Sequence, residues 1–534
     1  MLCLFPLWAN PMDLLLQYDD YPDQELPIQD QPAGQNAMAA AFALLTRDCP
    51  SDADPGDIIE ADTILRNDVY LRTNPLVKRS ILDYPAFYYP FCRPETWSLI
   101  GQLWVNQTPR MAFYNDAFAL RDYLAFDNKN LISQIDTLAS LVVGLNIPKI
   151  LSLLGDIEIE DRRAALMFWF QRQKGKWLIQ WKTPLAYIER NFQLDEQEKA
   201  QLEQEVSGFF NTGNDIPAEV ASLSGTQNEE FEAFKKQHLI SDKFGLGDSR
   251  FTAGYTFVDN DSLWVNAGFL ATIPTAFAFS KGVWKGSHFP KNSDHPPFDL
   301  AEILLLALGD DAERAQAQQL TINFLLGALD KLSANLLDDN IGNGGHVGLG
   351  FVYDSKLQVT PRFSFDTHAE FEYLLPVMEK RFYINAKDQA GFNAVAQNPA
   401  DCPNDLNFIQ EQLIQILYPR VYNTMVFPGV LIKFSTAADI WIAEQSTLNL
   451  GYDLWWQQQE KLGRIIASSQ NQALARKDIA TKPSAFQSKL FGAYTYNHPG
   501  KCGDWCISLT ADYTFLSAGI GKDYSASFRL EYLF

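Results

Sequence analysis

The sequence has no run of about 18 apolar residues, the length that a transmembrane helix needs, although 47% of its 534 residues are hydrophobic. A helical membrane protein is therefore excluded. A membrane β-barrel is not excluded, because lipid-facing and lumen-facing residues alternate along its strands and leave no long apolar run. The length suits either several soluble domains or one large barrel with long loops.

Positive charge is also scarce. The 43 Lys and Arg residues are outnumbered by 65 Asp and Glu residues, and the formal net charge is -22. A nucleic-acid partner would favour a basic patch, so this composition argues against one.

Cysteine is rare, and its six positions indicate neither a metal nor another cofactor. None of them forms a Cys-x-x-Cys pair, and no histidine lies beside them at zinc-ligand spacing. In an exported protein, Cys502 and Cys506 could form a disulfide across the tight turn between them, and Cys49 with Cys92 is a second possible pair. Unpaired thiols are the alternative, because so short a closed loop is easily strained.

The end of the chain alternates between apolar and polar residues. Every second position is apolar or aromatic: Tyr524, Ala526, Phe528, Leu530, Tyr532 and Phe534. The positions between them are almost all polar, as Arg529 and Glu531 illustrate. A period of two places these sets on opposite faces of a strand, one suited to lipid and the other to water. The pattern recurs at 250–257, 346–353, 362–373, 447–456 and 505–515.

These segments are longer than the roughly 5–6 residues usual in a soluble sandwich, the all-β alternative. They reach the length of about ten that a tilted transmembrane strand needs, and aromatic residues such as Trp505 and Phe515 flank them. We therefore predict an all-β membrane fold: an antiparallel transmembrane β-barrel of about 12 strands, within a range of roughly 10–14.

The terminal strand Phe528–Phe534 resembles the last strand of bacterial outer-membrane barrels, which ends in an aromatic residue. The resemblance is to a class that includes porins, transporters, enzymes and adhesins. It implies location in the outer membrane and contact with outer-membrane lipid. It also implies recognition by the barrel-assembly machinery through Phe528, Leu530, Tyr532 and Phe534.

Candidate strands divide the chain into three parts. Residues 1–10 are expected to be a truncated secretory signal, since they are apolar but lack a basic start; the alternative is no signal. Residues 11–96 are irregular and form a lumenal plug, a lid or a periplasmic tail. The barrel occupies 97–534, with strands near 97–106, 162–172, 176–186, 248–258, 262–274, 343–354, 358–375, 425–435, 440–456, 484–497, 504–516 and 522–534.

The connections between these strands alternate in length. Short turns are expected at 173–175, 259–261, 354–356, 435–439 and 498–503, and long loops at 107–161, 187–247, 275–342, 376–424 and 457–483. Outer-membrane barrels have short periplasmic turns and long outer loops, so this alternation fits. Apolar residues at helical spacing predict helices at 299–308 and 312–337. Residues 195–210, rich in Glu and Gln, are expected to form a solvated helix, and 227–240 and 405–418 short amphipathic ones. These helices either cap the barrel or fold into its lumen.

Ionisable residues fall on the inward face of the predicted strands. One strand contributes Arg362, Asp366, His368, Glu370 and Glu372; the others contribute Lys433, Asp453, Lys489, Asp512, Arg529 and Glu531. Such residues either set the field of a pore or pair into salt bridges that fill a closed barrel. Asp366 and His368 could form a base and its orienting group, but no serine matches them. Barrel phospholipases place Ser two residues after their His, where this chain has Glu370, so we predict no enzyme.

The long helical loops loosely resemble those of long-chain fatty-acid outer-membrane transporters. Members of that family carry an Asn-Pro-Ala hatch motif, and the triplet Asn398-Pro399-Ala400 occurs here only in a late loop. Pro274 would interrupt a ladder and either open a lateral gap or end a strand. We predict a channel or transporter for a small solute or hydrophobic compound. The alternative is a closed barrel that displays its loops for recognition or adhesion; a transporter should fold some loops inward.

Overall fold

The computed structural model of the protein describes residues 70–71, 76–87, 97–111, 124–125, 158–193, 233–282, 284–307, 309–383, 410, 414, 418–499 and 504–533. The chain divides into two units, 1–48 and 49–534, and all described residues belong to the second. Several predictions concern residues outside the described part of the chain. They are the signal segment at 1–10, the helix at 195–210, most of the helix at 405–418, the possible disulfide between Cys49 and Cys92, Cys502, Phe534 and the triplet Asn398-Pro399-Ala400.

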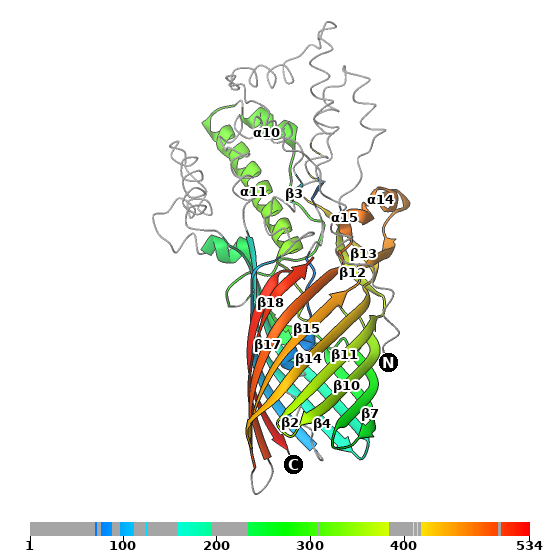
Figure 1. The fold of residues 1–534 in the computed structure, drawn as a ribbon. Coiled ribbons are helices and arrows are strands. Elements are labelled where there is room, and N and C mark those ends of the chain that lie inside the picture. The colour runs from blue at the N-terminus through cyan, green and yellow to red at the C-terminus, as the bar shows by residue number, and fades with distance from the viewer. Residues whose placement is uncertain are drawn as a thin grey trace, which may run out of the picture. The chain divides into compact units, whose positions relative to one another are not determined.

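A closed antiparallel β-barrel dominates the described part of the chain (Figure 1). Its twelve strands, all within the described residues, confirm the predicted fold class and correspond one to one with the predicted strands. The ring closes through pairing of β19 with β2, β2 with β4 and β4 with β5. In chain order the strands are β2 (Trp97–Arg110), β4 (Glu158–Lys174), β5 (Trp177–Gln193), β7 (Ser249–Asp259), β8 (Leu263–Ile273), β10 (Gly348–Thr360), β11 (Phe363–Leu374), β14 (Gly429–Ala443), β15 (Ser446–Gln457), β17 (Ala485–His498), β18 (Asp504–Ala518) and β19 (Lys522–Leu533).

The barrel is apolar outside and polar inside, the reverse of a soluble protein. On β19, Tyr524, Phe528 and Leu530 are exposed, whereas Ser527, Arg529 and Glu531 between them are buried. All backbone groups of a closed ring can pair within it, which lipid requires because it offers no hydrogen bonds. This polarity is that of a membrane-spanning β-barrel.

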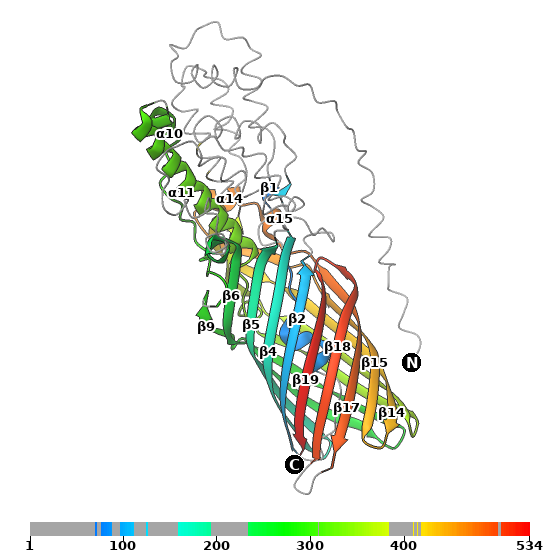
Figure 2. The same cartoon turned by 90° about the vertical axis from the view of Figure 1, so that its left-hand side faces the viewer.

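Short turns gather at the end of the barrel where β19 finishes, and long connections gather at the other end (Figures 1 and 2). We call these the periplasmic and outer ends. Two predicted turns are wrong. Residues 354–356 belong to β10, which turns at 361–362, and residues 435–439 belong to β14, which turns at 444–445. Both polar stretches are strand, since Lys356 and Asp439 point inward and bond to each other at 2.5 Å.

Near the outer end several strands of the wall are interrupted, and five further strands continue the wall beyond these interruptions. They are β6 (Ile240–Leu246), β9 (Phe277–Lys281), β12 (Val377–Tyr383), β13 (Arg420–Phe427) and β16 (Lys461–Ile466). β6 pairs with β5 and with β9, while β12, β13 and β16 form a separate sheet. Pro274 lies in the break between β8 and β9, and Pro428 lies between β13 and β14. Proline cannot donate to a ladder, which is consistent with these positions.

Helices lie at the outer end: α10 (Leu300–Ala307), α11 (Asp311–Leu336), α14 (Ser469–Leu474), α15 (Lys477–Ala480) and the π-turn η3 (Lys235–Leu239). The two-residue strands β1 (Tyr70–Leu71) and β3 (Leu124–Ala125) pair with each other. α11 begins with a capping box, in which Asp310 accepts from the Glu313 amide at 3.0 Å and Glu313 accepts from the Asp310 amide at 2.9 Å. Among the described residues, no helix is long and apolar enough to cross a membrane.

The inverted polarity predicts a depth-dependent cost of charge on the outer face. Leu509, in the middle of β18, is 56% exposed, and Leu516, near its outer end, is 49% exposed. Leu509→Arg should destabilise the barrel by about 2–4 kcal/mol and Leu516→Arg by about 0–1 kcal/mol. Urea unfolding of the protein in lipid vesicles would measure both, and equal costs would contradict a lipid-facing β18.

Candidate functional site in the barrel lumen

Residues 76–87, which we call the plug, lie inside the barrel (Figure 2, the blue helical turns behind β2 and β19). The plug contains the 3-10 turns η1 (Ile81–Asp83) and η2 (Pro85–Phe87). Leu76 packs with Met111 and Ile159 at the outer rim, whereas Gln102, five residues into β2, donates to the Ala86 carbonyl at 2.6 Å. The plug therefore runs from the outer rim toward the periplasmic end.

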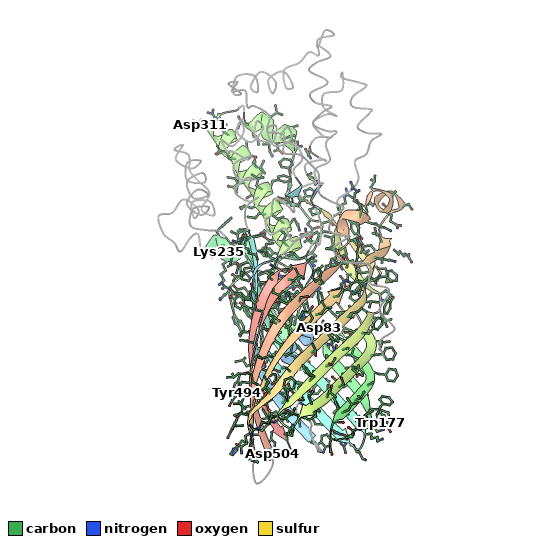
Figure 3. All side chains as sticks on the ribbon, viewed as in Figure 1. Asp83, Trp177, Lys235, Asp311, Tyr494 and Asp504 are labelled. Atoms are coloured by element: carbon green, nitrogen blue, oxygen red, sulfur yellow. The ribbon has the colours of Figure 1, made fainter. Side chains whose placement is uncertain are left out.

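Asp83 is the centre of the plug and is fully buried (Figure 3). One carboxylate oxygen, Oδ1, lies 2.8 Å from both Arg250 NH2 and Lys433 Nζ, and the other accepts from Trp455 Nε1 at 3.3 Å. Burial alone would raise the pKa of Asp83, but the charges of Lys433 and Arg250 outweigh it and lower that pKa. The charged carboxylate thus ties the plug to β7, β14 and β15.

Glu370 and Glu372 of β11 complete this central cluster. Arg250 lies 3.2 Å from Glu370 and 3.0 Å from Glu372, and Lys433 also pairs with Glu370. Buried charges are tolerated when each has a partner, because desolvation of an unpaired ion costs several kcal/mol. The cluster therefore fills the middle of the lumen with paired charges.

Two further plug residues bind other parts of the wall. Arg79 NH1 lies 2.8 Å from Asp453 Oδ2, with both side chains fully buried. Tyr84 donates to Asp523 at 2.7 Å, its ring lies 4.8 Å from that of Trp104, and Lys489 Nζ lies 4.4 Å from its centroid. The plug is thus anchored to strands all around the ring.

The described plug residues have no strand pairing with the wall. Wall side chains bind its carbonyls instead: Arg163 donates to the Arg79 carbonyl at 2.8 Å, and Arg250 to the Leu82 carbonyl at 3.2 Å. Side-chain contacts can be broken without breaking the backbone hydrogen bonds between the strands of the wall. The plug and the barrel are therefore separable in principle.

Ten predicted lumen residues have buried side chains on the barrel's inner face: Asp366, His368, Glu370, Glu372, Lys433, Asp453, Lys489, Asp512, Arg529 and Glu531. Lys489 pairs with Asp512 at 2.7 Å, and Arg529 with Glu531 at 2.5 Å. Arg362 is a correction, since it lies exposed in the turn before β11 rather than on the strand. Cys506 is buried on the inner face of β18; its predicted partner is not among the described residues.

The suggested pairing of His368 with Asp366 is also corrected. His368 Nδ1 lies 2.6 Å from Asp354, its cross-strand neighbour on β10, and Nε2 lies 3.0 Å from Glu370. Asp366 instead faces Lys356 at 3.3 Å. Asp354 and Glu370 thus engage both ring nitrogens of His368, and neither is left for Asp366.

Sequence reasoning missed Arg250 and the plug residues. Arg250 could have been found, because it occupies a polar position of the alternation at 250–257. Asp83 and Arg79 carried no signal, since their segment has no periodicity and their partners lie up to 374 residues away in the sequence.

Cavities remain on both sides of the plug. A cavity of about 420 Å³ at the periplasmic end is lined by Lys356, Asp366, Asp439 and Trp441 among others. A smaller one of about 90 Å³ lies at the outer end, between the plug and residues 339–344. Lys78 of the plug bonds to Asp339 at 2.9 Å there, so the chain after α11 folds inward onto the plug.

No protein family matches the chain, and no curated protein matches it either. Similar solved structures include an outer membrane channel from Pseudomonas putida F1 (8% identity, 86% of this chain and 100% of that one, TM-score 0.39). Others are the toluene transporter TbuX of Ralstonia pickettii (10%, 84% and 92%, TM-score 0.31) and the translocator domain of the autotransporter NalP from Neisseria meningitidis (6%, 83% and 90%, TM-score 0.31). These values establish no family.

The central cluster predicts unequal costs for removing its members. Lys433→Met leaves buried Asp83 and Glu370 short of a cation and should cost about 3–5 kcal/mol of unfolding free energy. Asp83→Asn should cost less, about 1.5–3 kcal/mol, because Arg250 and Lys433 still have Glu370 as an ion-pair partner. Urea unfolding in vesicles would measure both, with Asp261→Asn in the exposed β7–β8 turn as control. A Lys433→Met variant as stable as the control would contradict this account of the cluster.

The ion pairs of Glu379 on β12 predict that the protein loses stability in acid. Burial would raise the pKa of Glu379 on β12, but Arg381 at 3.0 Å and His346 at 2.5 Å lower it to about 2. Because the folded pKa lies below the usual 4.5, this stabilisation is present above pH 4.5 and is lost as pH falls toward 2. Glu379→Gln should flatten the fall in unfolding free energy between those values, and an unchanged slope would contradict the prediction.

Proposed function

We propose that this protein is a gated outer-membrane channel in which the plug must move before a small solute crosses the lumen. The observation that carries the proposal is the attachment of the plug. It fills the middle of the barrel, yet only side chains hold it there in the described part of the chain. A permanently closed barrel would need no separable segment, since wall side chains could fill it.

The cavities on either side of the plug support this function. They place space for water and solute at both ends of the lumen, with the plug between them. Charged side chains line both cavities, as in pores that select solutes by their field. Moving one short segment would join two spaces that already exist.

The inward fold of the chain after α11 favours transport over the display of loops. Asp339 reaches Lys78 of the plug at 2.9 Å and Arg190 of the wall at 2.9 Å. A recognition module would keep such a loop exposed for its partner. Contact with the plug instead couples the outer loop to the gate.

A second route, for a hydrophobic compound, is suggested by the interrupted wall. β9 is the last strand of its sheet and β12 is the edge of another, so neither has a partner on its far side among the described strands. Phe277 and Phe279 of β9 are 63% and 58% exposed. A hydrophobic solute could leave the lumen toward lipid between these edges once the plug has moved.

Single-channel conductance in a planar bilayer tests the gate. The full chain should be mostly closed, Asp83→Asn should open more often because the plug loses its link to Lys433 and Arg250, and deletion of residues 76–87 should give larger steps. Asp261→Asn removes the same charge outside the lumen and should behave as the unaltered chain.

Heat-modifiable migration would verify that each variant is a folded barrel. Silence from a folded deletion variant would rule out a pore beneath the plug. Steps that are equal in size and frequency in all four proteins would show that the plug does not gate.

A further inference from the structure

The outer cavity has more basic than acidic side chains around it, although the whole chain carries a net charge of -22. Five Lys and Arg side chains and four Asp and Glu side chains line it. The acidic groups are matched: Glu460 bonds to Arg381 at 2.8 Å, for example, and Asp339 to Lys78 at 2.9 Å. One of the five cations has no hydrogen-bond or ion-pair partner for its side chain among the described residues, whereas Lys78, Arg79, Arg163 and Arg381 each pair with a carboxylate.

That cation is Lys482, just before β17. Its backbone amide donates to Glu460 Oε1 at 2.7 Å, but its ammonium has no hydrogen-bond or ion-pair partner among the described residues. Arg381, only 4% exposed, also lines the cavity, and its Nε is buried without a partner. Both residues line the same cavity and contact Glu460, Arg381 through its guanidinium at 2.8 Å and Lys482 through its backbone amide at 2.7 Å.

The plug lines the cavity with apolar as well as charged residues. Val77 and Ile81 line it from the plug, and Leu374 and Leu431 line it from the wall. At about 90 Å³ the cavity is large enough for several waters or for a group of a few heavy atoms. A ligand there would meet both hydrogen-bond donors and apolar surface.

We propose that this cavity binds a small carboxylate with a short apolar chain, its oxygens accepting from Lys482 Nζ and Arg381 Nε. Charge-assisted hydrogen bonds are stronger than neutral ones, and a planar carboxylate suits two adjacent donors. Burial and the nearby Arg381 lower the pKa of Lys482, and a bound anion would offset both effects. The inference deepens the proposed function, because a solute entering from outside would meet the plug here.

Binding is tested without any conductance measurement. The full chain folded in detergent is titrated with butyrate by saturation-transfer NMR, in parallel with butyramide and inorganic phosphate. Butyrate should bind, butyramide should bind at least tenfold more weakly, and Lys482→Gln should weaken butyrate at least tenfold. Lys482→Arg, which keeps the charge, should retain binding.

Lys461→Gln is the matched control, since Lys461 is exposed beside Glu460 and does not line the cavity. Equal butyrate binding by the Lys482→Gln and Lys461→Gln proteins, or no butyrate binding at all, would overturn the site. Tighter binding of phosphate than of butyrate would overturn the apolar part of the assignment. A conducting protein with no butyrate site would sink this inference alone, whereas a silent deletion variant that binds butyrate would sink only the channel.

Discussion

The pairing of buried charge inside the lumen is the constraint on which the rest of this structure depends. Asp83 cannot stay ionised in the middle of a barrel unless cations meet it, and Arg250 and Lys433 both do so at 2.8 Å. Those cations in turn require Glu370 and Glu372. The plug is therefore one member of a network that the wall cannot complete without it, and its position follows from that need.

The need to pair buried charges also explains how the plug closes the lumen: its described residues are held by side-chain contacts and not by backbone pairing with the wall. Backbone pairing satisfies the wall, so the wall stands without the plug. The plug is held by ion pairs and hydrogen bonds of its own side chains to several strands, and these must break together for it to leave. Water entering the lumen would solvate each freed charge and lower the cost of that step. In the proposed gate, release of the plug and hydration of the lumen are therefore one event.

Much of the barrel could be predicted from sequence because a period of two is a local property. Strands such as β18 and β19 show this period residue by residue. Ten of the eleven suggested lumen residues are buried on the inner face, where the period places them. Turns were less visible, since inward polar residues such as Lys356 look like turn residues until their partner Asp439 is known. The plug could not be predicted. Its Asp83 depends on Arg250 and Lys433, which only the closed ring brings together.

Paired charges also connect the plug to the outer end of the barrel. Lys78 of the plug reaches Asp339, which also binds Arg190 of the wall, so the loop after α11 bridges the plug and the wall. Burial would raise the pKa of Asp339, but Arg190 and Lys78 lower it, and the bridge stays charged at neutral pH. An anion bound by Lys482 and Arg381 would lie in the same cavity as Lys78, since all three residues line it. Its negative charge would attract Lys78 and weaken the pairing of Lys78 with Asp339, which is the link between the plug and this loop.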